Sequence, residues 1–246
     1  MQPTRIDRAD TLDTEDLIAT YVAVVPTLRL NFVASIDGAA TVEGRSAGLG
    51  TAADKKVFGI LRQLCDGLIV GAGTVRDEHY GPVRASDEQR AWREAHGLEP
   101  HPRLVIVSSR LDLDPTAPVF ADAPVRPVVL THESSDEVDR SVLSEVADVV
   151  AHGTGLVDLR AGVEQLRNEY RLNQLLCEGG PHLFASLHAA GLVDELCLTL
   201  SPMLAGPGAD RIIVGDRGPN EPATSPMRLH HAIAADSTLL LRYVRG

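Results

Sequence analysis

The chain has 246 residues, of which 44% are hydrophobic and 23% are charged, so it can bury a sizeable core and we do not expect it to be disordered. Its formal net charge is −11 and its Lys and Arg residues form no basic run, which argues against nucleic acid or an anionic membrane as the main partner. This length permits one domain or two. We expect a single domain over 1–246, with its core at about 28–244 and an N-terminal extension over 1–20.

The three cysteines, Cys65, Cys177 and Cys197, form no Cys-x-x-Cys pair, and each lies in an apolar run. This pattern favours buried reduced thiols over a disulfide framework or a zinc site. The segment Met1–Asp16 is charged, unlike a secretory signal, and the chain contains no run of about eighteen apolar residues that would span a membrane. We therefore predict a cytoplasmic protein without a metal site.

Short apolar runs rich in β-branched residues alternate with helical stretches, which is typical of an α/β layered fold. The sequence predicts strands over Leu28–Ser35, Gly67–Gly71, Leu104–Ser108, Val128–Thr131, Val149–Ala151, Gln174–Cys177 and Glu195–Ser201. It predicts helices over Ala52–Cys65, Ser135–Ala147, Leu156–Tyr170 and Pro181–Ala190.

The C-terminal part of the chain has a different pattern. Two further strands are predicted over Met227–Ala234 and Thr238–Val244, and they favour an antiparallel edge on a mostly parallel sheet. The segments from His79 to Pro102 and from Ala205 to Pro226 are predicted to be loops, the first with some helix around Glu88–His96.

A strand-to-glycine turn follows the predicted strand over 67–71, with the sequence Gly71-Ala72-Gly73-Thr74. The glycines would let the backbone approach a ligand closely, and the N–H groups and the Thr74 hydroxyl would donate to an anion. A tight turn from strand to helix also needs glycine without any ligand. Both interpretations stay open for this motif alone.

A second strand-to-glycine turn follows the predicted strand over 174–177, with the sequence Glu178-Gly179-Gly180-Pro181. Pro181 suits the first position of a helix, whose free N–H groups and dipole suit a pyrophosphate. Glu178 lies at the carboxyl end of the strand, where open α/β sheets bind their ligands. A functional carboxylate is therefore favoured over a loop cap.

The predicted strand over 104–108 ends in Ser108-Ser109-Arg110. Hydroxyl groups and a guanidinium at the end of a strand would suit a ribose 2′-phosphate, which would select NADPH over NADH. Serine and arginine also end strands without any ligand. This motif by itself favours neither interpretation.

The first predicted strand contains Asn31 and Ser35, which share a parity and would point into one cleft. It leads into Asp37-Gly38, a strong turn dipeptide, so a structural role is favoured for Asp37. Ser46 follows in a glycine-flanked loop that would close over a ligand.

In this order the four stretches resemble the pyrimidine reductase family of riboflavin biosynthesis. The resemblance extends from about Leu28 to Tyr243 and is most specific at 34–38, 71–76, 178–181 and 193–196. It implies a three-layer α/β fold like that of dihydrofolate reductase, with a mostly parallel central sheet and antiparallel C-terminal strands. It also implies a homodimer.

The resemblance further implies a cofactor site and a substrate site. Together with the motifs above, it assigns to NADPH the residues Ala34, Gly48, Leu49, Thr51, Gly71, Gly73, Thr74, Glu78, Ser108, Ser109, Arg110, Gly179, Gly180, Pro181, His182, Leu183 and Phe184. It assigns to a phosphorylated heterocyclic substrate Asn31, Ser46, Arg62, Pro82, Arg84 and Glu178. Arg62 and Arg84 are the candidates for the substrate phosphate, because a guanidinium binds phosphate bidentately.

The implied reaction reduces 5-amino-6-(5-phosphoribosylamino)uracil to the ribitylamino compound. Glu178 would orient the substrate or relay a proton, and Asp37 is the weaker catalytic candidate. Many members of the family carry an N-terminal zinc deaminase domain, for which this chain has neither the length nor the His/Cys ligands, so we expect it to reduce only. Fused members usually have Lys where this chain has Asn31, and a neutral amide cannot supply the same charge to a substrate.

Two rival functions remain. A pterin reductase on the same fold, such as a dihydrofolate reductase, would want a carboxylate to hold the protonated ring, and Glu178 or Asp37 would be available for it. A non-catalytic homologue that binds a nucleotide or metabolite is the other, and Asn31 motivates it.

Overall fold

The computed structural model describes residues 6–8, 13–215 and 224–246 of the chain. Its strands are β1 (Ile6–Arg8), β2 (Thr27–Ser35), β3 (Gly67–Gly71), β4 (Arg103–Val107), β5 (Val128–Thr131), β6 (Asp148–Ala151), β7 (Gln174–Cys177), β8 (Glu195–Ser201), β9 (Met227–Ala235) and β10 (Thr238–Arg245). Its helices are α1 (Thr14–Tyr21), the 3₁₀ turn η1 (Ser46–Leu49), α2 (Ala52–Leu64), α3 (Ala72–Asp77), α4 (Asp87–Ala95), α5 (Pro118–Ala121), α6 (Glu137–Ser144), α7 (Leu159–Asn168) and α8 (Pro181–Ala189).

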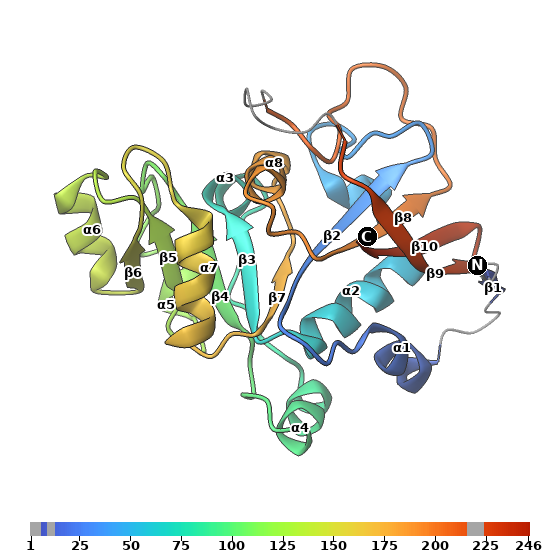
Figure 1. Ribbon diagram of the computed structural model, residues 1–246, viewed down its shortest axis with the longest axis horizontal. Coiled ribbons are helices and arrows are strands. Elements are labelled where there is room, and N and C mark those ends of the chain that lie inside the picture. The colour runs from blue at the N-terminus through green and yellow to red at the C-terminus, as the bar shows by residue number, and fades with distance from the viewer. Residues whose placement is uncertain (1–5, 9–12, 216–223) are drawn as a thin grey trace.

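Within the described residues the strands form one ten-stranded sheet in the order β1-β9-β10-β8-β2-β7-β3-β4-β5-β6 (Figure 1). Neighbouring strands are parallel except where β10 pairs with β9 and with β8. This confirms the predicted fold class, a mostly parallel sheet with antiparallel C-terminal strands. The parallel strands end at one edge of the sheet, where open α/β sheets bind their ligands.

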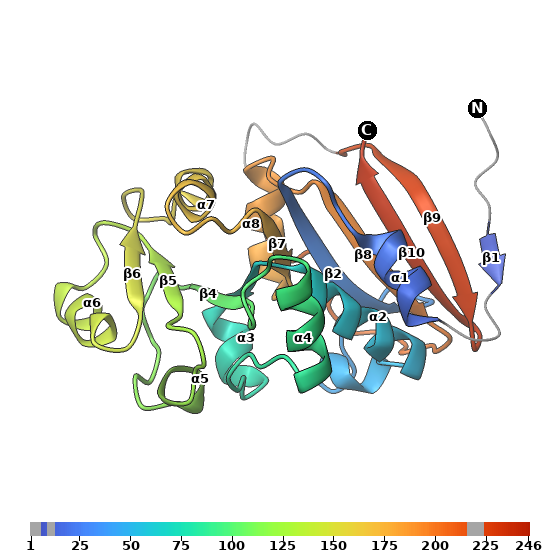
Figure 2. The same ribbon diagram turned by 90° about the horizontal axis from the view of Figure 1, so that it is seen from below.

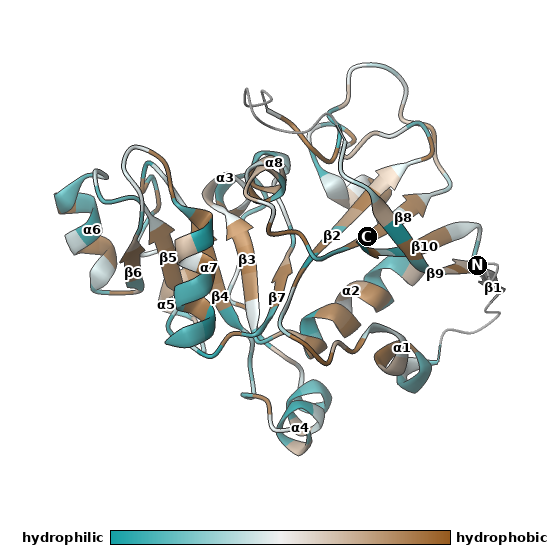
Figure 3. Cartoon of the chain, in the orientation of Figure 1, coloured by the Kyte–Doolittle hydropathy of each residue, from teal (hydrophilic) through white to brown (hydrophobic). Residues whose placement is uncertain are grey.

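Helices cover both faces of the sheet and give the molecule three layers (Figure 2). On one face, α7 and α8 pack on a core that includes Leu30, Ile69 and Leu166. On the other, α1, α2, α3, α5 and α6 pack on a core that includes Leu61 and Val70. Figure 3 shows hydrophobic residues along β3 and β7, which are covered on both sides, and a mixture on α7, which has one face towards solvent. No helix in the described part of the chain is long and apolar enough to cross a membrane.

The four predicted helices are all shorter than the sequence pattern suggested, and in two of them a capping side chain fixes where the helix begins. The Asp136 carboxylate accepts hydrogen bonds from the Val138 and Asp139 amides, so α6 begins at Glu137 and not at Ser135. Asp158 caps α7 in the same way, so that helix begins at Leu159 and not at Leu156. The other two, α2 and α8, begin at Ala52 and Pro181 as predicted, and each ends one residue earlier than predicted.

Several short elements were not predicted, namely β1, α1, α3 and α5. The elements β1, α3 and α5 have too few residues to show a hydrophobic period, whereas α1 is longer but buries only Leu17 and Tyr21. The segment over 79–102 contains α4, close to the helix expected around Glu88–His96, and a capping box of Ser86 and Gln89 marks its start. The predicted loop over 205–226 has no helix or strand at 205–215 or 224–226, and residues 216–223 lie outside the described part of the chain.

A buried ionic cluster joins β2, β8 and β10. Glu195 accepts hydrogen bonds from Arg29 Nε at 2.7 Å and from Arg242 Nη2 at 2.5 Å, and the three side chains are at most 9% exposed. The arginines also donate to the Tyr21 and Thr20 carbonyls, which holds the end of α1 on the sheet. Burial alone would raise the pKa of Glu195, but Arg242 and Arg29 outweigh it and hold that pKa below its usual value.

We predict that Glu195→Gln lowers the free energy of unfolding by about 3 kcal/mol, because two buried guanidinium groups lose their counter-charge. Urea denaturation at neutral pH would measure the loss. Since the pKa of Glu195 is lowered in the folded chain, the difference between wild type and variant is present above the unfolded-state pKa and shrinks as the pH falls through the folded-state value. Asp87→Asn, which removes the exposed pair with Arg90, is the control and should cost about 0.5 kcal/mol or less. Equal losses in the two variants would contradict the prediction.

Candidate functional site

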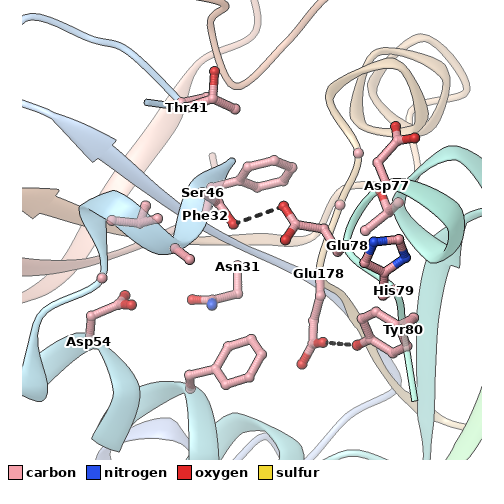
Figure 4. Close-up of a pocket in the computed structure, with 18 of the residues that line it drawn as sticks. Asn31, Phe32, Thr41, Ser46, Asp54, Asp77, Glu78, His79, Tyr80 and Glu178 are labelled. Atoms are coloured by element: carbon pink, nitrogen blue, oxygen red, sulfur yellow. Dashed lines mark hydrogen bonds between the residues drawn. The ribbon is translucent and has the colours of Figure 1, made fainter. Parts of the chain in front are cut away.

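A cleft of about 600 Å³ lies at the carboxyl edge of the sheet. Its floor comes from β2 and from the turn that follows β7, and its walls come from α2, from the segment over 74–83 and from the loop between β2 and α2 (Figure 4). A cleft of this size accommodates a small molecule, and it is at the place where parallel sheets hold ligands.

The two strand-to-glycine turns meet beside this cleft. The Gly71 amide donates a hydrogen bond of 3.0 Å to the Gly179 carbonyl, because β3 and β7 are neighbours. Gly179 has φ +132, a backbone conformation that favours glycine, and the peptide bond to Gly180 is cis. A Cβ added at Gly180 would lie 3.0 Å from Thr74 Oγ1, and one at Gly71 would lie 3.7 Å from the Gly180 nitrogen. Bare backbone and one hydroxyl therefore form this wall of the cleft.

Glu178, immediately before these glycines, is the centre of a hydrogen-bonded group. Arg62 donates to its two carboxylate oxygens from Nε and Nη2, each at 2.6 Å, and the Tyr80 hydroxyl donates to Oε2. The Glu178 side chain is 3% exposed and that of Arg62 is 32% exposed. The bidentate pair fixes the orientation of the carboxylate at the cleft.

Burial and neighbouring charge set the protonation of this group. Burial alone would lower the pKa of Arg62, but the hydrogen bonds and charge of Glu178 outweigh it and raise that pKa. Burial and, after it, the charge of Glu178 raise the pKa of Tyr80. At neutral pH the arginine is charged and the tyrosine is a protonated donor.

The other predicted substrate residues do not all line the cleft. Asn31, Ser46 and Pro82 line the cleft together with Arg62 and Glu178, which follows the prediction. Ser46 Oγ lies 3.5 Å from Glu78 Oε1, so the loop after β2 contacts the segment after α3. Arg84 does not line the cleft, and its guanidinium donates to the Asp122 carbonyl. Of the two predicted phosphate arginines, the structure brings only Arg62 to the site.

Among the predicted cofactor residues, the structure places Thr74, Glu78, Gly179, Gly180 and Pro181 in the cleft lining. Those outside the lining are Ala34, Gly48, Leu49, Thr51, Gly71, Gly73, Ser108, Ser109, Arg110, His182, Leu183 and Phe184. Within the Ser-Ser-Arg motif, the buried Ser108 accepts from the Leu111 amide through Oγ, which is a turn contact, whereas Ser109 and Arg110 are exposed. Their role towards a 2′-phosphate stays a prediction.

Asp37 lies in the turn after β2 and outside the cleft lining. Its Oδ1 accepts from the Ser35 hydroxyl at 2.5 Å and from the Ala205 amide at 3.1 Å, and its Oδ2 accepts from the Gly206 amide at 2.9 Å. The Ser35 hydroxyl and these two amides lower the pKa of Asp37 to about 2. The geometry is that of a carboxylate that ties the loop after β8 to the end of β2.

Several cleft residues were not predicted. Asp54 and Phe58 belong to α2. Thr41, Asp77, His79 and Tyr80 come from the surrounding loops and from α3 (Figure 4). The signal for the first two was available, because Asp54, Phe58 and Arg62 are spaced by four and share a helix face. The loop residues carry no such pattern.

The fold and the site together define a three-layer α/β protein with a glycine-walled cleft for a small molecule. The model of the RibD C-terminal domain family matches residues 26–241. The chain belongs to this family.

Sequence identity to two relatives and similarity to a crystal structure support this assignment. The chain is 32% identical to a 2,5-diamino-6-ribosylamino-4(3H)-pyrimidinone 5′-phosphate reductase of Archaeoglobus fulgidus, over 78% of this chain and 86% of that protein. It is 29% identical to the protein of that name in Methanothermobacter thermautotrophicus, over 90% and 99% of the two chains. A crystal structure of a pyrimidine reductase-like protein from Corynebacterium diphtheriae superposes with a TM-score of 0.83 at 26% identity, over 95% of this chain and 98% of the other. The chain is therefore an oxidoreductase of the riboflavin-biosynthesis pyrimidine reductase type.

We predict that Asp37→Ala speeds hydrogen exchange at the Ala205 and Gly206 amides, because both lose their acceptor. Exchange followed by mass spectrometry would measure it. Asp112→Ala, at a side chain that is 75% exposed, is the control and should leave this segment unchanged. In the wild type the protection should persist at acidic pH and be lost only as the pH falls through about 2, where Asp37 takes up its proton. Unchanged exchange in Asp37→Ala would refute the structural role.

Proposed function

We propose that the chain uses NADPH to reduce the ribosylamino group of a 6-ribosylaminopyrimidine 5′-phosphate to a ribitylamino group, in the cytoplasm. The observation that carries the proposal is the placement of Glu178, bound by Arg62, directly beside the wall formed by Thr74, Gly179 and Gly180. A polar anchor and a backbone wall in one cleft suit a polar substrate next to a dinucleotide.

The residues present fit the nicotinamide dinucleotide. The wall at Gly180 has no side chain, and a Cβ there would fill the space in front of Thr74 Oγ1. The amino end of α8, which begins with Pro181, adds free N–H groups and a positive dipole end suited to a pyrophosphate. When bound, NADPH would supply the hydride for C1′ of the sugar. A chain of net charge −11 can hold such an anion only through local groups of this kind.

On the substrate side, Glu178 would orient the sugar, while Arg62 and Tyr80 keep the carboxylate in place. Asn31 would donate to or accept from the substrate at the floor of the cleft. Two rings are candidates. The sequence resemblance implies the 5-aminouracil, whereas the two archaeal relatives are named for the 2,5-diaminopyrimidinone.

We predict that the wild type oxidises NADPH when given either phosphorylated ribosylaminopyrimidine, and that Gly180→Leu binds NADPH at least about tenfold more weakly, a loss of about 1.4 kcal/mol. The leucine Cβ would lie 3.0 Å from Thr74 Oγ1 and its side chain would occupy the cleft wall. Calorimetry with NADPH would measure binding, and loss of NADPH absorbance would measure turnover.

Gly81→Ala is the matched control, since Gly81 also lines the cleft but a Cβ there meets nothing within 4 Å. Unaltered NADPH affinity in Gly180→Leu would sink the cofactor assignment. A wild type that oxidises no NADPH with either nucleotide would contradict the proposed function.

We also propose that two copies of the chain associate through β8 and β10. Leu196, Leu198 and Leu200 on β8 pair with Tyr243, Leu241 and Leu239 on β10, and all six side chains are only half-buried on the same sheet face. A second copy would cover these two apolar rows.

We predict that Leu198→Glu shifts the protein from dimer to monomer in light scattering, because a carboxylate in the middle of the apolar rows would be buried without a partner. Leu156→Glu is the control, at a leucine that is 77% exposed in the segment before α7. A wild type that already scatters as a monomer would contradict the proposed dimer.

A further inference from the structure

Three cleft residues lie along one face of α2. Asp54, Phe58 and Arg62 follow one another at intervals of four, so they stack on successive turns, and all three line the cleft. The Arg62 guanidinium lies over the Phe58 ring, 4.3 Å from its centre. At 1.5 Å per residue, Asp54 is roughly 12 Å from Arg62 along the helix. Asp54 is therefore a polar group of its own, separate from the Arg62–Glu178 pair.

Figure 4 shows Asn31 between Asp54 on one side and Glu178 on the other. Asp54 is half-buried, and its Oδ2 lies close to Gly50. A Cβ added at Gly50 would lie 3.5 Å from this oxygen. Burial raises the pKa of Asp54 above its usual value, although a hydrogen bond with Thr199 and the charge of Lys55 oppose the rise. A carboxylate that is partly removed from water by burial is stabilised when a ligand supplies further N–H donors.

The other carboxylates of the cleft have different surroundings. Asp77 and Glu78 are exposed. Glu178 is buried, but Arg62 and Tyr80 already donate to both of its oxygens. Asp54 is the cleft carboxylate that combines partial burial with room for donors from a ligand.

We propose that Asp54 recognises the edge of a 2-amino-4-oxopyrimidine ring at which the ring N–H and the exocyclic NH₂ group point the same way, and that it thereby selects this ring over uracil. The inference rests on the proposed function and names its substrate class. Phe58, one turn further along α2, supplies an apolar surface for the face of the ring.

The chemistry of the two candidate rings differs at C2. In the 2,5-diaminopyrimidinone, N3–H and the 2-amino group are adjacent donors, so a carboxylate can accept two parallel hydrogen bonds, as it does from a guanidinium. Uracil has a carbonyl at C2, and one carboxylate oxygen would face another oxygen without a proton between them. The N3 atom is opposite C6, the atom that bears the sugar. Recognition of the ring and reduction of the sugar therefore take place at opposite ends of the substrate, as Asp54 and Glu178 are on opposite sides of Asn31.

Binding of two small analogues tests this directly. The compounds 2,6-diaminopyrimidin-4-one and 6-aminouracil share N3–H, the 4-oxo group and the 6-amino group, and they differ at C2 and in the hydrogen on N1. Calorimetry with the full chain therefore compares the two edges that the proposal distinguishes. We expect the wild type to bind the diamino compound at least about tenfold more tightly, the size of one discriminating contact pair. Asp54→Asn should reverse the preference, because an amide accepts from N3–H through its oxygen and donates to the C2 carbonyl through its NH₂. The same preference in wild type and variant would overturn the proposal.

Turnover gives a second readout. The ratio of kcat/KM for the diaminopyrimidinone nucleotide to that for the uracil nucleotide should fall by about 100-fold in Asp54→Asn, since both partners of the selection change. The ratio does not depend on how much of the variant is folded. Asp77→Asn, at an exposed carboxylate of the same cleft, is the control and should leave the ratio unchanged.

The outcomes separate the two proposals. A wild type that reduces neither nucleotide contradicts the proposed function, and the analogue pair then still tests Asp54. Equal ratios in wild type and Asp54→Asn overturn the role of Asp54 and leave the function standing. Dihydrofolate carries the same 2-amino-4-oxo edge, so its turnover in place of the nucleotides, lost in Asp54→Asn, would support recognition by Asp54 and contradict the ribosylaminopyrimidine as substrate.

Discussion

The hydrogen bond from the Gly71 amide to the Gly179 carbonyl is the contact on which the cleft depends. It exists because β3 and β7 are parallel neighbours that end together, and because neither turn carries a side chain that would hold them apart. The same contact places Glu178 at the end of β7, within reach of Arg62 on α2. Backbone packing at the edge of the sheet thus determines both the wall of the cleft and the position of its buried carboxylate.

One face of β2 carries a row of polar groups beneath α1 and α2. Arg29 belongs to the buried ionic cluster with Glu195, and two residues further on Asn31 reaches the cleft. On β8 the same face presents Glu195 and then Thr199, which hydrogen-bonds with Asp54. The buried charges of this row are therefore held by specific partners. Asn31 is the β2 residue of this row that lines the cleft and can bind a ligand there.

The backbone-level features could be predicted from sequence, because they depend on residue types with restricted conformations. Apolar runs predict the parallel strands, and paired glycines at strand ends predict turns that meet at one edge. Asp37 and Arg84 show the limit, because a motif does not tell which way a side chain turns: Asp37 bonds to the loop at Ala205 and Gly206, and Arg84 to the Asp122 carbonyl. Tyr80 lies in an irregular segment and reaches Glu178 only through tertiary folding.

The backbone features of the fold and the proposed substrate selection depend on different parts of the chain. The glycine turns are constrained by backbone geometry, and a member that holds a dinucleotide against the sheet edge would need them. In the proposed function, selection of the ring depends instead on side chains of α2. The Asp54 side chain can change there while the cap of the helix stays, because the Thr51 hydroxyl accepts from the Asp54 backbone amide. A carboxylate at that position matches two adjacent donors, and an amide matches one donor beside one acceptor. Under the proposed function, a single side chain would thus separate two substrates that differ at C2, while the fold and the glycine wall stay the same.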